Sequence, residues 1–269
     1  MKNVDLALSR LTHEAAVWVT VASTEGSVPR DAGTWMAVFG TDTVGTIGGG
    51  HVEFQAIAHA RSVLAGAAVA LQRRFALGPS LGQCCGGVMH LRFEPVDASS
   101  AALLRQRLAA ALTPVALFGG GHVGQAVVRA LGPLPFAVCW IDSRDGVFPP
   151  LPPGAIVTEH SDPVHAAVDA LAAGSLVLIM SFSHAEDLDI VAACLRRIRV
   201  SNDLPFIGLI GSRTKWATFR HRLQDRGFPD GELARITCPI GIAGVPGKEP
   251  EAIAIAVAAQ LLQHRGHAT

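Results

Sequence analysis

The chain has 269 residues, enough for one large domain or two ordinary ones. Its 22 lysines and arginines balance its 22 aspartates and glutamates, and only 16% of its residues are charged, which excludes the broad basic surface that binds nucleic acids or anionic membranes. No apolar run reaches the roughly 20 residues that span a bilayer, the start lacks the apolar core of a signal peptide, and five scattered cysteines do not suggest a disulfide framework, so we expect a cytoplasmic protein without nucleic-acid or membrane partners.

Residues 1–95 have the pattern of a small α+β domain. Apolar residues at helical spacing predict a first helix, and runs rich in β-branched residues predict strands. A loop of turn-forming residues, 23–33, follows the first strand and holds one cation, Arg30. The predicted elements are helices over 4–16 and 54–64 and strands over 17–22, 35–39, 43–47 and 88–93.

Three consecutive glycines, Gly48, Gly49 and Gly50, stand just before the second of these helices. Glycines at such a place expose backbone N–H groups without side chains in the way, which is the arrangement of an anion-binding nest. A flexible turn before a helix explains the same residues equally well. His51 follows directly, and is a metal ligand or, alternatively, a capping or core histidine.

Two adjacent cysteines, Cys84 and Cys85, lie in a glycine-containing loop before the strand at 88–93. A thiolate beside glycine N–H groups would have a lowered pKa and could ligate a soft metal or carry sulfur. Neighbouring residues in extended chain point to opposite sides, so one thiol should face any one pocket. The alternative is that both are small buried hydrophobic residues. Since no C-x-x-C spacing occurs, a structural zinc site is not expected.

The segment 96–113 is predicted to be a linker and a helix, after which a glycine motif organises residues 114–269. Gly119, Gly121 and Gly124 have the G-x-G-x-x-G spacing that opens a βαβ unit, and the N–H groups of the following helix, from His122 on, suit an anion. Asp142 ends the next predicted strand about 20 residues later, where dinucleotide-binding proteins place an acid. We therefore predict a Rossmann-like domain with a parallel sheet, and leave open whether it binds a nucleotide.

Further along the chain, polar residues follow two buried strands, 175–180 and 205–210. His184 lies just past the first strand and Ser212-Arg213 just past the second, at the edge where open α/β sheets bind ligands. Ser212 and Arg213 form a phosphate grip or, alternatively, a helix cap with a solvated cation. The remaining predictions are a strand at 156–157, a helix over 163–171 capped by Ser161-Asp162, and an alanine-rich helix over 252–262. The 49% hydrophobic content, much of it alanine, favours tight helix packing or a buried subunit face, and we expect a homodimer.

Taken together, these motifs resemble those of the XdhC/CoxI family of xanthine dehydrogenase accessory proteins, over nearly the whole chain. Gly120 replaces the alanine usual in that family, and Phe182 stands where a histidine is expected, so a role for a histidine pair does not transfer. The segments that carry the resemblance are Gly26–Arg30, Gly45–Glu53, Phe75–Gly87 with its Gln83-Cys84-Cys85-Gly86-Gly87 core, Phe118–Gly124, Trp140–Arg144, Gly208–Arg213 and Cys238–Gln260.

The resemblance implies a molybdenum cofactor chaperone without enzymatic turnover. Such a protein binds molybdopterin, holds it while a cysteine desulfurase supplies its sulfido ligand, and aids its insertion into xanthine dehydrogenase. The implied anion-binding groups are the glycines 48–50 with Arg30, Ser212 and Arg213, and the implied molybdenum ligand is Cys84 or Cys85. The glycine fingerprint keeps an NAD(P)-dependent oxidoreductase open as an alternative, and a scaffold that bridges desulfurase and dehydrogenase is a third.

Overall fold

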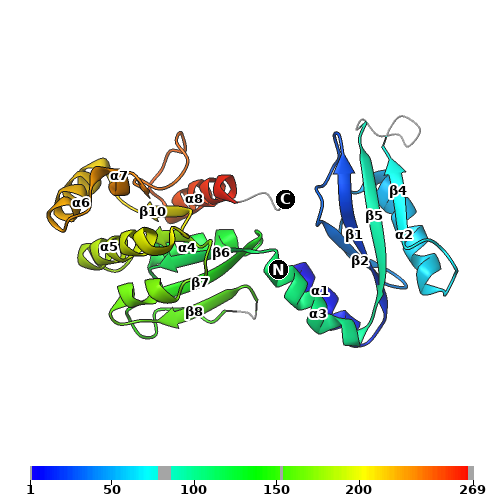
Figure 1. Ribbon diagram of the computed structural model, residues 1–269. Coiled ribbons are helices and arrows are strands. Elements are labelled where there is room, and N and C mark those ends of the chain that lie inside the picture. The colour runs from blue at the N-terminus through cyan, green and yellow to red at the C-terminus, as the bar shows by residue number, and fades with distance from the viewer. Residues whose placement is uncertain (1, 78–85, 152–153, 266–269) are drawn as a thin grey trace. The chain divides into compact units, whose positions relative to one another are not determined.

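The computed structural model describes residues 2–77, 86–151 and 154–265, and the chain divides into two compact units (Figure 1). One unit comprises residues 2–108, and the other comprises the residues from 109 onward. The first is built on an antiparallel sheet and the second on a parallel sheet, which confirms the predicted α/β class with a Rossmann-like C-terminal domain. No helix in the described ranges is long and apolar enough to cross a membrane.

The N-terminal unit contains a five-stranded antiparallel sheet with the order β3-β2-β1-β5-β4. The strand β4 was not predicted, because it lies at the sheet edge and only Phe75 of its five residues is buried, so no apolar alternation marks it. The strands are β1 (Ala16–Glu25), β2 (Trp35–Val38), β3 (Thr43–Gly45), β4 (Gln72–Ala76) and β5 (Val88–Val96).

Helices cover both faces of this sheet. Alternate residues of β1 point to opposite faces, so Val17 and Val19 pack with the helix α2 (Gly50–Leu64), whereas Trp18 packs with α1 (Lys2–Leu11). The helix α3 (Ala101–Ala110), which follows the short 3₁₀ helix η2 (Ala98–Ser100), contributes Leu104 to the second of these cores. The helix α1 ends before the predicted residue 16, and α2 starts four residues earlier than predicted.

The C-terminal unit has six parallel strands in the order β11-β10-β9-β6-β7-β8. When the strands β6 to β11 are renumbered 1 to 6 and the sheet is read from β8, the order is 3-2-1-4-5-6, which is that of dinucleotide-binding folds. The order reverses between β6 and β9, which makes their carboxyl ends the switch point where ligands bind in such sheets. The strands are β6 (Thr113–Phe118), β7 (Phe136–Asp142), β8 (Ile156–His160), β9 (Leu176–Ile179), β10 (Phe206–Leu209) and β11 (Ile236–Thr237).

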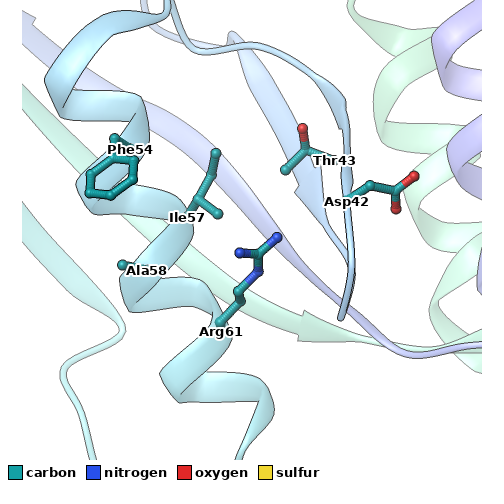
Figure 2. A pocket seen from close by; sticks show the side chains of 6 residues that line it. All are labelled: Asp42, Thr43, Phe54, Ile57, Ala58 and Arg61. Atoms are coloured by element: carbon teal, nitrogen blue, oxygen red, sulfur yellow. The ribbon is translucent and has the colours of Figure 1, made fainter.

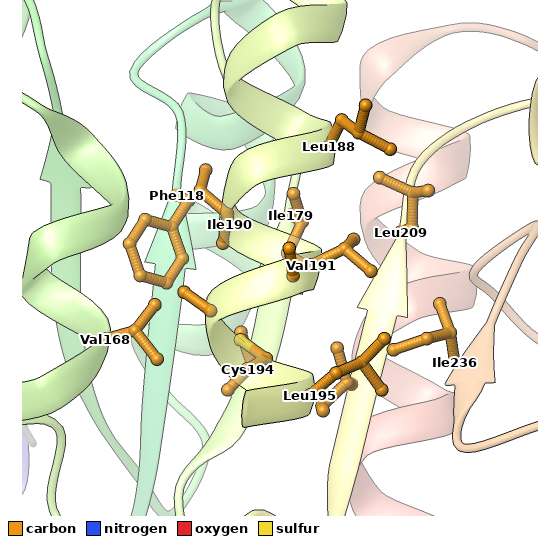
Figure 3. Close-up of a cluster of buried hydrophobic side chains, with 14 of the residues drawn as sticks. Phe118, Val168, Ile179, Leu188, Ile190, Val191, Cys194, Leu195, Leu209 and Ile236 are labelled. Atoms are coloured by element: carbon orange, nitrogen blue, oxygen red, sulfur yellow. The ribbon is translucent and has the colours of Figure 1, made fainter. Parts of the chain in front are cut away.

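Helices enclose the parallel sheet on both faces. The helices α4 (His122–Leu131) and α8 (Pro250–His264) pack on one face, with Leu117 and Leu178. The other face packs against α5 (His184–Ser201), which contributes Val191 and Leu195 to the core around Phe118 (Figure 3). Also on this second face lie the 3₁₀ helix η3 (Val164–Ala170), α6 (Arg213–Asp225) and α7 (Asp230–Leu233).

The helix predicted over 163–171 differs from the observed element. It is a 3₁₀ helix, η3, preceded by Pro163, and no side chain caps it. The Ser161 hydroxyl donates to the Pro163 carbonyl oxygen at 3.2 Å instead, so the predicted cap is wrong.

Candidate functional site

The glycine loop between β6 and α4 is shaped by close packing. Gly119 has φ +125°, and a Cβ atom added to it would overlap the Met180 carbonyl oxygen. A Cβ at Gly124 would overlap the Gly119 carbonyl oxygen. Gly121 differs, because an added Cβ would meet no heavy atom within 4 Å, and no side chain caps the helix that starts after it. The first and third glycines are therefore required by packing, whereas the second leaves the amides of His122 and the next residue approachable.

Asp142, at the end of β7, is engaged within the protein. It is 2% exposed and accepts a hydrogen bond from the Gly120 N–H at 2.6 Å. Arg144 donates to it from its backbone N–H, Nε and Nη2, each at 2.9 Å. Burial would raise the pKa of Asp142, but the hydrogen bonds from Arg144 and Gly120 outweigh burial and lower it. A ribose would have to displace Arg144 to reach this carboxylate, so ligand binding by Asp142 stays a prediction.

A second carboxylate, that of Glu186, lies near the switch point in the first turn of α5. The Ser143 hydroxyl donates to Glu186 Oε1 at 2.6 Å. Its other oxygen, Oε2, is buried and accepts no hydrogen bond from the described part of the chain. The sequence pattern Ser183-x-x-Glu186 predicts a capping box, and Ser183 does accept a hydrogen bond from the Glu186 N–H at 3.2 Å. Because this pattern already explains Glu186 as part of the helix start, the sequence gives no reason to consider its carboxylate a site residue.

An aromatic ring lies beside these charges. Phe182, in the loop after β9, is 66% exposed, and the Arg144 guanidinium lies 4.5 Å from its ring centroid. Arg144 thus contacts Asp142 and the Phe182 ring at once, and its guanidinium also interacts with the charge of Glu186. The sequence does not signal the contact between Arg144 and Phe182, because these two residues come from segments that are far apart in the chain.

A buried ion pair joins the ends of β9 and β10. Asp187, 2% exposed, accepts hydrogen bonds from the N–H and hydroxyl of Ser181 at 2.9 and 2.7 Å. Lys215 Nζ lies 2.6 Å from Asp187 Oδ2 and also donates to the Ile210 carbonyl oxygen at 2.9 Å. His184 is exposed at the start of α5, with its ring 6.2 Å from that of Phe219. The pair is a structural link between these two strand ends.

The two residues predicted as a phosphate grip open α6. The Ser212 hydroxyl accepts a hydrogen bond from the Lys215 N–H at 3.1 Å, so this serine caps the helix. Arg213 is exposed at the first helical position. The alternative of a capped helix with a solvated cation describes both residues, and their role in anion binding stays a prediction.

In the N-terminal unit, the three glycines before α2 have positive φ angles of 120°, 75° and 68°. The Gly49 N–H donates to the Glu53 carboxylate at 3.1 Å, and the Gly48 N–H donates to the Thr46 hydroxyl at 3.1 Å. Two of the three amides expected to form an anion nest are therefore engaged within the chain, and the third, that of Gly50, starts α2. The Glu53 carboxylate reaches the glycine turn because Glu53 lies in the first helical turn of α2, close to those amides.

His51 is an exposed residue of α2, and its ring Nε2 lies 2.9 Å from the amide nitrogen of Gln55, one turn away. No cluster of three or more histidine, cysteine or acidic side chains that could hold a metal occurs in the part of the chain that the structure describes. A metal role for His51 thus gains no support from its neighbours.

The loop that contains Arg30 contacts two other predicted motifs. A Cβ at Gly48 would come within 2.8 Å of Pro29 Cγ and 3.2 Å of Arg30 Cγ, so this loop packs directly on the glycine turn. The Gly87 N–H donates to the Ser27 carbonyl oxygen at 3.1 Å, and Gly87 accepts a hydrogen bond from the Leu77 N–H at 2.8 Å. Gly87, which follows the segment 78–85, is therefore tied to this loop, and Leu77, which precedes the segment, is tied to Gly87. Cys84 and Cys85 themselves lie outside the described residues.

A surface pocket of about 420 Å³ lies elsewhere in the same unit, between α2 and the chain around β3 (Figure 2). None of the predicted site residues lines it, so it is not the candidate site. Its lining residues are Asp42, Thr43, Phe54, Ile57, Ala58 and Arg61.

Comparison with known proteins gives consistent relatives. A family model described as the XdhC Rossmann domain matches residues 115–261, more than half of the chain, and a model of the XdhC and CoxI family matches residues 10–75. The protein YqeB of Escherichia coli (strain K12) is 27% identical over 259 residues, which are 92% of this chain and 43% of YqeB. The chain thus spans less than half the length of that relative.

A solved structure from Bacillus halodurans, described as a xanthine dehydrogenase, has a similar fold. It aligns with a TM-score of 0.74 and 21% identity over 98% of this chain and 96% of the other. At this identity the match supports the fold alone.

Proposed function

Because the chain belongs to the XdhC and CoxI family, we propose that it is an accessory protein of a xanthine dehydrogenase that binds, protects and hands on the molybdenum cofactor. A cysteine desulfurase supplies sulfur to the bound cofactor in this proposal, and the dehydrogenase receives it. When bound, the cofactor supplies a redox-active metal that the client enzyme needs. The accessory protein itself only binds and shields it.

The match of both family models carries the proposal, and the residues of the N-terminal unit fit an anionic metal complex. The exposed residue Arg30 packs with its side-chain stem on the glycine turn at Gly48, and Gly87, which follows the segment 78–85, is hydrogen-bonded to the loop that carries Arg30. We assign the soft metal contact to Cys84 or Cys85, because thiolates are preferred donors for such metals. We assign the anionic oxygens to Arg30 and the Gly50 amide.

The Rossmann unit fits a phosphorylated ligand. The start of α4 presents uncapped amides next to Gly121, and Arg213 supplies an exposed cation at the same sheet edge. Gly119 and Gly124 hold the loop in the shape that exposes these amides. In this proposal the unit binds a phosphate, with or without a nucleotide attached. The ion pairs Arg144–Asp142 and Lys215–Asp187 take no part in that binding.

The decisive experiment is the molybdenum and pterin content of the full chain purified without oxygen from a molybdate-fed host. We expect near-equimolar molybdopterin in the wild type and its loss in Cys84→Ala or Cys85→Ala. Cys139→Ala is the matched control, since that thiol is half-buried and donates a hydrogen bond to the Glu159 carboxylate at an Sγ–Oε2 distance of 3.4 Å. Wild-type protein that carries no molybdopterin and takes none up would refute the proposal.

Two alternative functions predict different experimental results. An NAD(P)-dependent oxidoreductase would bind the nicotinamide cofactor stoichiometrically and change its absorbance with a substrate. The engagement of Asp142 by Arg144 weighs against that function, because the ribose-binding acid is not free. A scaffold would bring down desulfurase and dehydrogenase equally well from cells that cannot make the cofactor.

A further inference from the structure

The Oε2 atom of Glu186 lacks a donor in the described chain although it is buried. A buried carboxylate oxygen without a hydrogen bond is costly, whereas a donor that reaches it restores a strong, charge-assisted bond. Oε1 already accepts from Ser143 at 2.6 Å, but a carboxylate oxygen has a second lone pair for a further donor. The carboxylate is therefore suited to a ligand that presents two N–H donors side by side.

A flat ring has a stacking surface at the same place. Phe182 is 66% exposed and contacts Arg144 on one side, so the rest of its surface is open to an aromatic ligand. The carbonyl oxygen of Met180, two residues before it, packs against Gly119, which places the Phe182 loop beside the glycine loop. Stacked aromatic rings attract each other beyond the area that they bury.

Anion binding is supplied by α4. Its ten residues start after Gly121 with no capping side chain, so its first amides are available to a phosphate. Glu186 and Phe182 follow β9 and the glycine loop follows β6, so all three features lie at the switch point between these neighbouring strands.

We propose that this switch point binds a phosphorylated 2-aminopyrimidin-4-one ring, the hydrogen-bonding edge that pterins and guanine nucleotides share. That edge carries an amino N–H and a ring N–H in parallel, and they match the two oxygens of Glu186. Phe182 stacks on the ring, and the α4 amides bind the phosphate. For a pterin the inference rests on the proposed function, whereas for a guanine nucleotide it does not.

The test uses probe pairs that differ in the 2-amino group. Binding of pterin and of lumazine, which has an oxo group there, is measured on the full chain by fluorescence, and GMP and IMP are compared by calorimetry, with AMP as a third nucleotide. We expect the amino probe of at least one pair to bind about tenfold or more tighter than its partner, because a hydrogen bond to a charged group is lost in the partner. Equal binding within both pairs overturns the proposal, and GMP binding that AMP matches overturns it for guanine nucleotides.

Substitutions then show which residues cause the preference for the amino probe. Glu186→Gln should remove the preference for the amino probe and weaken lumazine or IMP, which keep only the ring N–H donor, less than pterin or GMP. Glu251→Gln, at an exposed glutamate of the same unit, should keep the preference. Phe182→Ala, at an exposed position that does not threaten folding, should weaken both members of a pair. Preference retained in Glu186→Gln refutes the assignment.

Molybdopterin content separates this inference from the proposed function. If wild type carries molybdopterin and no probe pair is discriminated, the inference fails and the proposed function stands. If GMP is preferred over IMP but no molybdopterin is bound, the proposed function fails and the inference stands for guanine.

Discussion

The ion pair between Lys215 and Asp187 allows a quantitative test of how the Rossmann unit is held together. The side chains are 13% and 3% exposed, and their charged atoms are 2.6 Å apart. At an effective dielectric constant of about 20, two unit charges at this distance attract by about 6 kcal/mol. Desolvation costs several kcal/mol for each ion, so the intact pair contributes little net stability.

Breaking the pair is a different matter. Asp187→Asn keeps an acceptor for Ser181 but leaves the Lys215 ammonium buried without a counter-charge, which we expect to cost about 3–5 kcal/mol. Glu251→Gln is the control, because its pair with Arg129 spans 3.5 Å between side chains that are 73% and 62% exposed. Such surface pairs contribute about 0–1 kcal/mol.

Urea denaturation gives the free energy of unfolding of each variant, and hydrogen exchange at β9 and β10 shows whether the loss falls in the Rossmann unit. The double variant Asp187→Leu/Lys215→Met should be less destabilised than Asp187→Asn, since no unpaired charge remains. The reasoning fails if Asp187→Asn and Glu251→Gln have the same stability, or if the double variant is at least as destabilised as Asp187→Asn.

Two further predictions concern the same unit. Gly119→Ala should destabilise it by about 2 kcal/mol or more, because φ is +125° and the new Cβ overlaps the Met180 carbonyl. Gly121→Ala should cost less than about 1 kcal/mol. Urea denaturation compares the two variants, and equal losses of unfolding free energy would contradict the packing argument. Hydrogen bonds from Arg197 lower the pKa of Asp203 to about 2, so this carboxylate binds fewer protons in the folded state and its stabilisation is lost as the pH falls from 3.8 towards about 2. Acid denaturation of Asp203→Asn should lack that part of the pH dependence, and an unchanged profile would show that the pair is not coupled to folding.

The parallel sheet could be predicted because its signals are local. An apolar strand, glycines at fixed spacing and a helix follow one another from β6 to α4, and close packing requires the first and third of these glycines, as the spacing implies. The strand β4 could not be predicted in the same way, because its pairing with β5 and not its own composition makes it a strand. Likewise, the apolar spacing that predicted an α-helix over 163–171 does not distinguish it from the 3₁₀ helix η3.

The use of the site residues is harder to predict from the sequence, because it depends on contacts between distant segments. Asp142 has the position of a ribose-binding acid, but Arg144, two residues later, folds back on it. The Gly49 amide has the position of a nest, but Glu53 accepts its hydrogen bond. In both places the chain supplies its own counter-charge, and a motif that records only spacing does not show this.

The cysteines differ in what they can offer a metal or a sulfur donor. Burial raises the pKa of Cys139 and of Cys194 to about 12, and that of Cys238 to about 11. A free thiol with such a pKa stays protonated at neutral pH and is a poor nucleophile. The proposed function is therefore tested at Cys84 and Cys85 and controlled at Cys139.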